Sequence, residues 1–344
     1  CIGGTGRISI FKNNDSTTHW TLVQQFTDPD SSFGNKLGFN GNMMFANGSI
    51  FERIPTSLNT SKYILDSTTA SSFENEQKIT ASDGASSDRF GYNVSVNGNT
   101  LVVGAYADDS SKGSVYVYTR SSATDPFGIQ QKITASDGAS NDQFGVSVSV
   151  DGNTLVVGSA RADSSRGAVY VYTRSSATDP FGNQQKITAS EGNTNDYFGA
   201  SVSVDGNTLV AGAYRDNSSR GSVYVYTRSS ATDPFGNEQK ITAFETDYLG
   251  WIVSVDGNTL VAGAYRDDNL GTDSGAVYVY TRSSATDPFG YQQKIAASDG
   301  AELDYFGETL SVDGNTLIAS AYADDSSKGS VYVYTRSSAT APFG

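Results

Sequence analysis

The chain repeats itself every 54 residues over most of its 344-residue length. The tripeptide Gln-Lys-Ile recurs with its lysine at Lys78, Lys132, Lys186, Lys240 and Lys294, and a proline keeps the same step at Pro126, Pro180, Pro234, Pro288 and Pro342. A fixed period of this length indicates equal supersecondary units that stack on one another. The architecture of one unit therefore determines that of most of the chain.

One unit contains four segments with strand character. Residues 90–96 alternate and end in the tight turn at 97–100, residues 101–104 are a short apolar run, and residues 113–118 alternate Val with Tyr. The fourth segment centres on residues 130–134. Turn-forming residues separate the segments, and none has the period of a helix. The unit is predicted to be a four-stranded antiparallel meander.

Both faces of the third segment carry packing groups. Val115 and Val117 point to one face, and Tyr116 and Tyr118 point to the other. A sheet of this kind needs a neighbour on each side, and a ring of four-stranded blades, the β-propeller, supplies it. A linear β-solenoid is the alternative, but its rungs are usually far shorter than 54 residues.

The recurring motifs resemble those of a known family. Phe-Gly opens the first segment at Phe90, Phe144, Phe198 and Phe306; Val-Gly-Ala or Ala-Gly-Ala and then Gly-Ser/Ala-Val-Tyr-Val-Tyr follow. This order resembles the FG-GAP repeats of the integrin α-subunit propeller and of many microbial and algal surface proteins. The resemblance is close over residues 75–344 and loose over residues 1–74, where it rests on residues 6–11 and Phe33-Gly34.

The resemblance implies an all-β fold, a β-propeller of four-stranded antiparallel blades with a 54-residue repeat. We expect a single propeller domain over residues 1–344. Residues 1–74 would form divergent N-terminal strands and a first blade, and residues 75–344 the regular repeats, the last of them truncated.

The family's strand order makes the Phe-Gly strand innermost and gives an expectation for the blade count. The chain would start in a third strand at residues 6–12, add a fourth at 20–27, pass through five complete blades, and end after the third strand at 329–336. Six blades could close with residues 20–27 as the missing outer strand. A truncated seven-bladed ring is favoured, because the chain stops inside a loop that elsewhere leads into another strand.

Charge and rare residues limit the classes of function. Lys and Arg number 23 against 37 Asp and Glu, so the net charge is −14, and such a surface repels nucleic acid. No apolar run reaches the ~18 residues of a membrane span. Cys1 is the single cysteine and the first residue of the sequence. A fragment of a longer chain and a lipidated tether at Cys1 are both open interpretations. His19 is the single histidine, so no His-based triad or metal cluster can form, and we expect no catalytic site.

The loops of one rim differ between copies, whereas those of the other are nearly identical. In a meander the loops after the second and fourth strands share one end, and the second-strand loops vary most. The fifth unit lengthens this loop at residues 269–273 and shortens the preceding fourth-to-first-strand loop at 244–247. The predicted ligand-binding residues of this rim are Tyr106, Asp108, Asp109, Tyr214, Arg215, Asp216, Tyr265, Arg266, Asp267, Asp268, Tyr322, Asp324 and Asp325. Drift in solvent-exposed turns is the alternative.

No metal or other cofactor is expected. Related propellers often bind Ca²⁺ in a loop patterned Asp-x-Asp-x-Asp-Gly-x-x-Asp, whereas here that loop is only Val-Asp-Gly-Asn-Thr and offers too few oxygens. The pairs Asp108/Asp109, Asp267/Asp268 and Asp324/Asp325 could bind Ca²⁺ weakly at the surface. Solvated acidic turns are the favoured interpretation of these pairs.

These observations favour a non-enzymatic, secreted or cell-surface binding or adhesion propeller with an unidentified protein or glycan ligand. One alternative is a structural spacer module, supported by the near-identity of the copies. The other is a propeller-type hydrolase or lyase with a central-channel site, for which Glu308 is the notable acid of the inner strands. Trp251 is interpreted as inner-strand packing, with an aromatic platform at the channel mouth as the second interpretation.

Overall fold

In a computed structural model, the described residues are 6–13, 20–28, 37–40, 43–46, 49–52, 76–243 and 247–344. The chain divides into two compact units, Cys1–Ile79 and Thr80–Gly344. Expectations drawn from Cys1, His19, Phe33-Gly34 and Phe244 lie outside the described residues.

The first unit contains two antiparallel sheets. One pairs β1 (Gly6–Asn13) with β2 (Trp20–Asp28). The other has the order β3-β4-β5-β6, with β3 (Leu37–Asn40), β4 (Met43–Ala46), β5 (Ser49–Glu52) and β6 (Gln77–Lys78). The strands expected near residues 6–12 and 20–27 are therefore confirmed.

The second unit contains four four-stranded meanders and one three-stranded meander. The first is β7 (Asn93–Asn97), β8 (Thr100–Ala105), β9 (Ser114–Thr119) and β10 (Ile129–Ile133). The second is β11 (Phe144–Asp151), β12 (Thr154–Ser159), β13 (Ala168–Thr173) and β14 (Gly182–Ile187). The third is β15 (Ser201–Asp205), β16 (Thr208–Ala213), β17 (Ser222–Thr227) and β18 (Gly236–Thr242). The fourth is β19 (Ile252–Asp256), β20 (Thr259–Ala264), β21 (Ala276–Thr281) and β22 (Gly290–Ile295). The last is β23 (Phe306–Asp313), β24 (Thr316–Ala321) and β25 (Ser330–Thr335).

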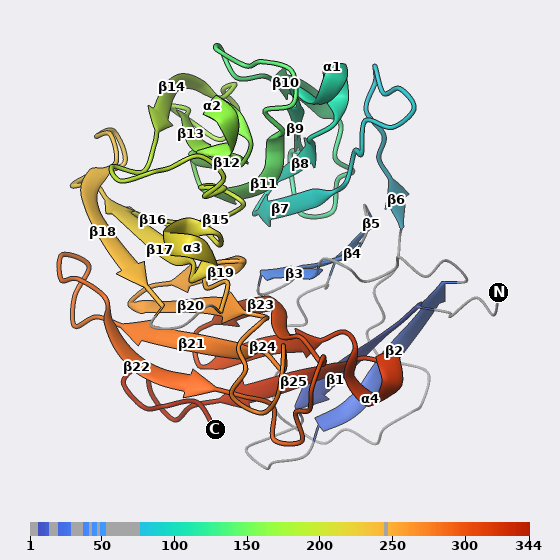
Figure 1. Ribbon diagram of the computed structural model, residues 1–344. Coiled ribbons are helices and arrows are strands. Elements are labelled where there is room, and N and C mark those ends of the chain that lie inside the picture. Colours follow the sequence, from blue (N-terminus) through green and yellow to red (C-terminus); the bar gives the residue numbers. More distant parts are fainter. Residues whose placement is uncertain are drawn as a thin grey trace. The chain divides into compact units, whose positions relative to one another are not determined.

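These sheets have the sequence-predicted order. Counting the sheet β3–β6, the described strands form five complete four-stranded blades, followed by one that ends at its third strand. Within the second unit the first strands β7, β11, β15, β19 and β23 lie next to one another in succession (Figure 1). The all-β fold of propeller blades with the Phe-Gly strand innermost is thus confirmed.

The hydrophobic core of the second unit lies between successive blades. Val156 and Val171 of the blade β11–β14 are buried against Phe198, Leu209 and Tyr224 of the blade β15–β18. The other neighbouring blades of this unit bury the corresponding residues. Between neighbouring blades of this unit, the Val face of one blade is therefore buried against the Tyr face of the next, as the two-sided alternation requires.

Polar side chains join the blades at their outer edge. The side-chain amide of Gln185 makes two hydrogen bonds to the backbone of Phe235 in the next blade. Its NH2 group donates to the Phe235 carbonyl at 2.8 Å, and its oxygen accepts from the Phe235 N–H at 3.0 Å. Arg228 donates to the Thr154 hydroxyl of the preceding blade at 2.7 Å, and its guanidinium lies 4.4 Å from the Phe235 ring centroid. These contacts recur between the other neighbouring blades of this unit, which explains why the repeat keeps Gln, Arg and Phe at these positions.

Candidate functional site

Four of the predicted rim loops contain a short helical turn. These are α1 (Asp108–Ser111), α2 (Ala162–Ser165), α3 (Asp216–Ser219) and α4 (Asp324–Ser327). The last three residues of each turn have positive φ, a conformation that costs most L-residues about 1–2 kcal/mol each. The sequence predicted only polar loops here, because these turns are too short to show a helical period.

Each turn also positions the start of the next blade. The N–H of Tyr197 donates to the carbonyl of Ser165 at 3.0 Å, and that of Tyr248 donates to the carbonyl of Ser219 at 3.2 Å. Tyr305 donates in the same way to Asp273, in the lengthened loop, at 3.2 Å. All three tyrosines have φ between 55° and 57°, which is unusual for an aromatic residue. This backbone conformation determines the direction in which the three tyrosine rings project from the chain.

The first aspartate of three predicted rim loops is buried rather than solvated. Asp216 is 1 % exposed; its carboxylate lies 2.9 Å from the Lys240 ammonium and accepts from the Tyr224 hydroxyl at 2.8 Å. Asp108 pairs with Lys132 at 2.7 Å, and Asp267 with Lys294 at 2.6 Å. Asp324, which is half-buried, accepts from Tyr332 at 3.2 Å. Among the predicted pairs, the interpretation as solvated turns is therefore wrong for Asp108 and Asp267, and holds for the exposed Asp109, Asp268 and Asp325.

These ion pairs give the lysines of three Gln-Lys-Ile segments, Lys132, Lys240 and Lys294, a structural role. Burial alone would raise the pKa of Asp108, but the hydrogen bonds from Lys132 and Ser114 hold it below its ordinary value. Because this pKa is lower in the folded chain, the associated stability is present above about pH 4 and is lost as the pH falls through the folded value.

Aromatic rings form a continuous row along the same rim, which we call the aromatic belt. It contains Tyr197, Tyr214, Tyr248, Trp251, Tyr265, Tyr305 and Tyr322. Successive tyrosine ring centroids lie between 5.2 and 6.1 Å apart. Trp251 lies 4.8 Å from Tyr214 and 4.6 Å from Tyr265, so it packs within this rim. The belt extends over the blades β15–β18, β19–β22 and β23–β25.

Two arginines of the rim lie over the belt. The Arg215 guanidinium is 5.3 Å from the ring centroid of Tyr197 and 5.7 Å from that of Tyr214. Arg266 is 5.2 Å from the ring centroid of Tyr248 and 5.5 Å from that of Tyr265. All four distances from a guanidinium to a ring centroid are within the range of cation–π attraction.

The structure therefore brings together five of the predicted rim residues, namely Tyr214, Arg215, Tyr265, Arg266 and Tyr322. Tyr106 packs instead on Tyr92, with ring centroids 4.5 Å apart. Sequence reasoning missed Tyr197, Tyr248 and Tyr305. Their signal was available: each directly precedes the Phe-Gly or Leu-Gly that opens its blade.

The inner strands carry a row of acids at the opposite end. Asp151, Asp205 and Asp256 each accept a hydrogen bond from a glycine N–H of the next blade, at 2.8, 2.6 and 2.6 Å. Among residues 76–243 and 247–344, no group of three or more His, Cys, Asp and Glu could hold a metal ion. The three carboxylates therefore hydrogen-bond neighbouring blades to each other.

We expect Asp205→Asn to raise the melting temperature by about 2 °C at neutral pH. Burial raises the pKa of Asp205, and the nearby Asp151 and Asp256 carboxylates raise it further. A raised carboxyl pKa means that stability increases as the pH falls through the folded value, and the asparagine removes this dependence. Asn97 provides a natural precedent, because its amide oxygen accepts from Gly152 at 3.2 Å.

Thermal melts at pH 7 and pH 5 test this expectation. Asp313→Asn is the matched control, because that carboxylate is exposed at the end of β23. A lower melting temperature for Asp205→Asn at pH 7 would contradict the argument.

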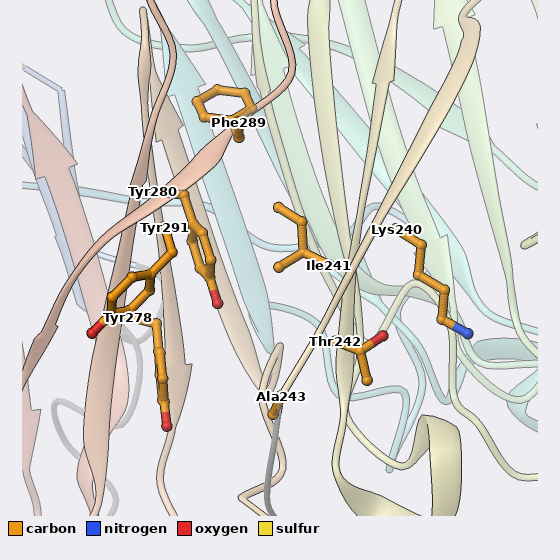
Figure 2. Close-up of a pocket in the computed structure, with 8 residues that line it drawn as sticks. All are labelled: Lys240, Ile241, Thr242, Ala243, Tyr278, Tyr280, Phe289 and Tyr291. Atoms are coloured by element: carbon orange, nitrogen blue, oxygen red, sulfur yellow. The ribbon is translucent and has the colours of Figure 1, made fainter.

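A slot of about 210 Å³ lies between the blades β15–β18 and β19–β22. Figure 2 shows Ile241 and Ala243 on one side and Tyr280, Tyr291 and Phe289 on the other. Lys240 points away from these aromatic rings (Figure 2), toward its ion pair with Asp216. The slot is smaller than pockets that hold drug-sized ligands, about 300–1,000 Å³. The belt, not the slot, is the larger candidate surface.

Comparison with known families agrees with this architecture. The family model for the FG-GAP repeat matches residues 73–118, 127–172, 181–226, 235–280 and 289–334, which together cover more than half of the chain. The chain belongs to the FG-GAP repeat family. Each FG-GAP match begins before the fourth strand of one blade and ends in the third strand of the next. Within the second unit, each FG-GAP match therefore spans the packed interface between two neighbouring blades.

No curated protein matches this FG-GAP chain. In the described part of the chain, no helix is long and apolar enough to span a membrane.

Proposed function

We propose that this FG-GAP protein is a non-enzymatic binding or adhesion module of the integrin-α kind, secreted or displayed at a cell surface. Its ligand face is the rim formed by the loops after the second strands, and its ligand is a protein or a glycan. The aromatic belt with Arg215 and Arg266 is the observation that carries the proposal.

Two features support the choice of this rim. Aromatic and arginine side chains are the residues that most often dominate binding interfaces. On the opposite rim the loop from Ser229 to Pro234 recurs almost unchanged between blades. Side chains suited to recognition therefore gather where the copies differ, whereas a purely structural spacer needs no such difference between its two rims.

An array of extracellular-matrix proteins and glycans tests the proposal. We expect the wild-type chain to bind at least one array member, and Tyr265→Ala combined with Arg266→Ala to weaken that binding about tenfold or more, since hot-spot residues cost about 2 kcal/mol each. The physical reason is the loss of one ring of the belt and of the cation over it.

Thr232→Ala is the matched control, because this residue is exposed on the opposite rim. We expect it to bind as the wild-type chain does, and thermal melts confirm that all variants are folded. The absence of any ligand for the wild-type chain, or equal loss in the control, would favour the spacer alternative.

A further inference from the structure

In four blades of the second unit, the fourth strand supplies a lysine to a polar site that we call the lysine site. Lys132 of β10 lies 2.6 Å from the Asp83 carboxylate and 2.7 Å from the Asp108 carboxylate. Its ammonium is 5.2 Å from the ring centroid of Tyr116, whose hydroxyl donates to Asp83 at 2.8 Å. The next three blades repeat this arrangement, each with a carboxylate paired to the lysine and a tyrosine ring centroid 5.4 Å from its ammonium, at Lys186, Lys240 and Lys294. The lysine site therefore consists of one or two carboxylates, a third-strand tyrosine and the ammonium that they hold.

The last blade has the acids and the tyrosine of the lysine site, but no described residue supplies the ammonium. Asp299, Asp324 and Tyr332 take the places that the two carboxylates and the tyrosine have in the first blade of this unit. The Tyr332 hydroxyl lies 2.8 Å from the Asp299 carboxylate and 3.2 Å from that of Asp324. Among residues 76–243 and 247–344, no lysine or arginine forms an ion pair with either carboxylate. Two carboxylates thus face one hydroxyl at the place where the other copies hold a cation.

The third strand of this blade also has an open outer edge. Among the described strands its sheet contains β23, β24 and β25 alone, and the outer edge of β25 is paired at Thr335, whose N–H and carbonyl both bond to Gly344. Val331 is 59 % exposed, whereas Val115 at the same place in β9 is fully buried and lies opposite Ile133 of the fourth strand. Unpaired backbone groups on an exposed strand edge are a template for a further strand. The edge and the two carboxylates therefore fit a single kind of ligand, an extended segment that carries a lysine.

We propose that the outer edge of β25 binds an extended segment of a partner protein as a fourth strand, and that a lysine of this segment pairs with Asp299 and Asp324. The lysine lies opposite Tyr332, and a branched apolar residue directly after it lies opposite Val331, as in the pairing of β10 with β9. An ammonium suits the site because it has three donors, enough for two carboxylates, and is attracted to the face of a tyrosine ring. The edge lies outside the aromatic belt, so this binding is independent of the proposed function.

A partner is the source of this segment because the candidate strands of the chain itself are engaged or lack the lysine. All five Gln-Lys-Ile segments are already paired within their own sheets, and a second copy of the chain has the same segments in the same state. The strand β2 contains no lysine. The net charge of −14 also favours a partner segment that carries positive charge.

Fluorescence anisotropy with a labelled peptide tests the proposal on the full chain. The peptide has the sequence of residues 183–190, which follow the Phe-Gly pair of their own blade as the added strand follows Phe343-Gly344. The control peptide carries Lys186→Met, which keeps the apolar stem and removes the ammonium. We expect the lysine peptide to bind about tenfold more tightly, since a hydrogen bond to a charged group contributes about this factor or more. Equal affinity of the two peptides would overturn the proposal.

Variants of the chain separate this site from nonspecific binding. Asp299→Asn combined with Asp324→Ala should reduce the affinity for the lysine peptide to that for the methionine peptide. Ala162 stands at the position of Asp324 in another blade, so the turn folds without the acid. Asp325→Asn is the matched control and should bind as the wild-type chain does, because this exposed carboxylate pairs with Lys328 at 2.7 Å.

Backbone hydrogen exchange locates the bound peptide. We expect the peptide to slow exchange in β25 and to leave exchange in β13 unchanged, because the outer edge of β13 is already paired with β14. Unchanged exchange in β25, or equal loss of affinity in Asp325→Asn and in the double variant, would refute the site. Neither measurement uses the matrix array, so failure here and failure of the proposed function are distinguishable.

Discussion

Gly212→Ala is expected to lower the free energy of unfolding by about 3 kcal/mol, at the upper end of the cost of overpacking. A Cβ atom at Gly212 would lie 1.9 Å from the carbonyl oxygen of Gly250 in the next blade and 2.8 Å from its carbonyl carbon. Both are backbone atoms of the turn that leads into β19, so no side chain can move aside to relieve the contact. The methyl group can be accommodated only if the two blades separate, which exposes the apolar core between them.

Urea denaturation followed by circular dichroism measures this loss. Gly236→Ala is the matched control, because a Cβ atom there would meet nothing within 4 Å. We expect the control to be unchanged or slightly more stable, since alanine reduces the freedom of the unfolded chain. A stability of Gly212→Ala equal to that of the control would show that the blades are not packed as described.

The last blade supports this reasoning from within the chain. Ser320 occupies the position of Gly212 in β24, the second strand of the last blade. The Ser320 hydroxyl is 2.8 Å from that of Thr309 within the same blade. Within this unit, glycine is therefore found at each position where a following blade approaches, and the last blade of the unit has a side chain there.

Lys240→Met is expected to destabilise the chain by about 3–5 kcal/mol, the cost of leaving a buried charge without its partner. Methionine keeps the apolar stem but removes the ammonium 2.9 Å from the Asp216 carboxylate. Asp216 is almost fully buried, so water cannot replace the lost charge. Thermal and urea unfolding at pH 7 measure the effect.

Asp216→Ala provides the comparison and should cost much less. The blade β11–β14 has Ala162 at the equivalent position, so the turn folds without an acid. Lys240 would keep Glu191, which lies 3.2 Å away in the loop after β14. If both variants lose the same stability, the ion pair is not what makes Lys240 important.

The strands could be predicted from local pattern, and the charged contacts could not. Alternation in segments such as residues 113–118 depends only on neighbouring residues, so it predicted β9. The burial of Asp216 depends on Lys240, which lies in another strand 24 positions later. In the sequence, a pair of aspartates in a polar loop has the composition of an exposed turn, which is why the solvated interpretation failed for Asp108 and Asp267.

The sequence alone determined the period, the number and order of strands within a repeat, and the two-sided blades, because each follows from spacing along the chain. Only the tertiary structure showed that Tyr197, Tyr214, Tyr248 and Tyr265 form one row with arginines beside the rings. Those rings come from different blades, and what brings them together is the packing of one sheet on the next.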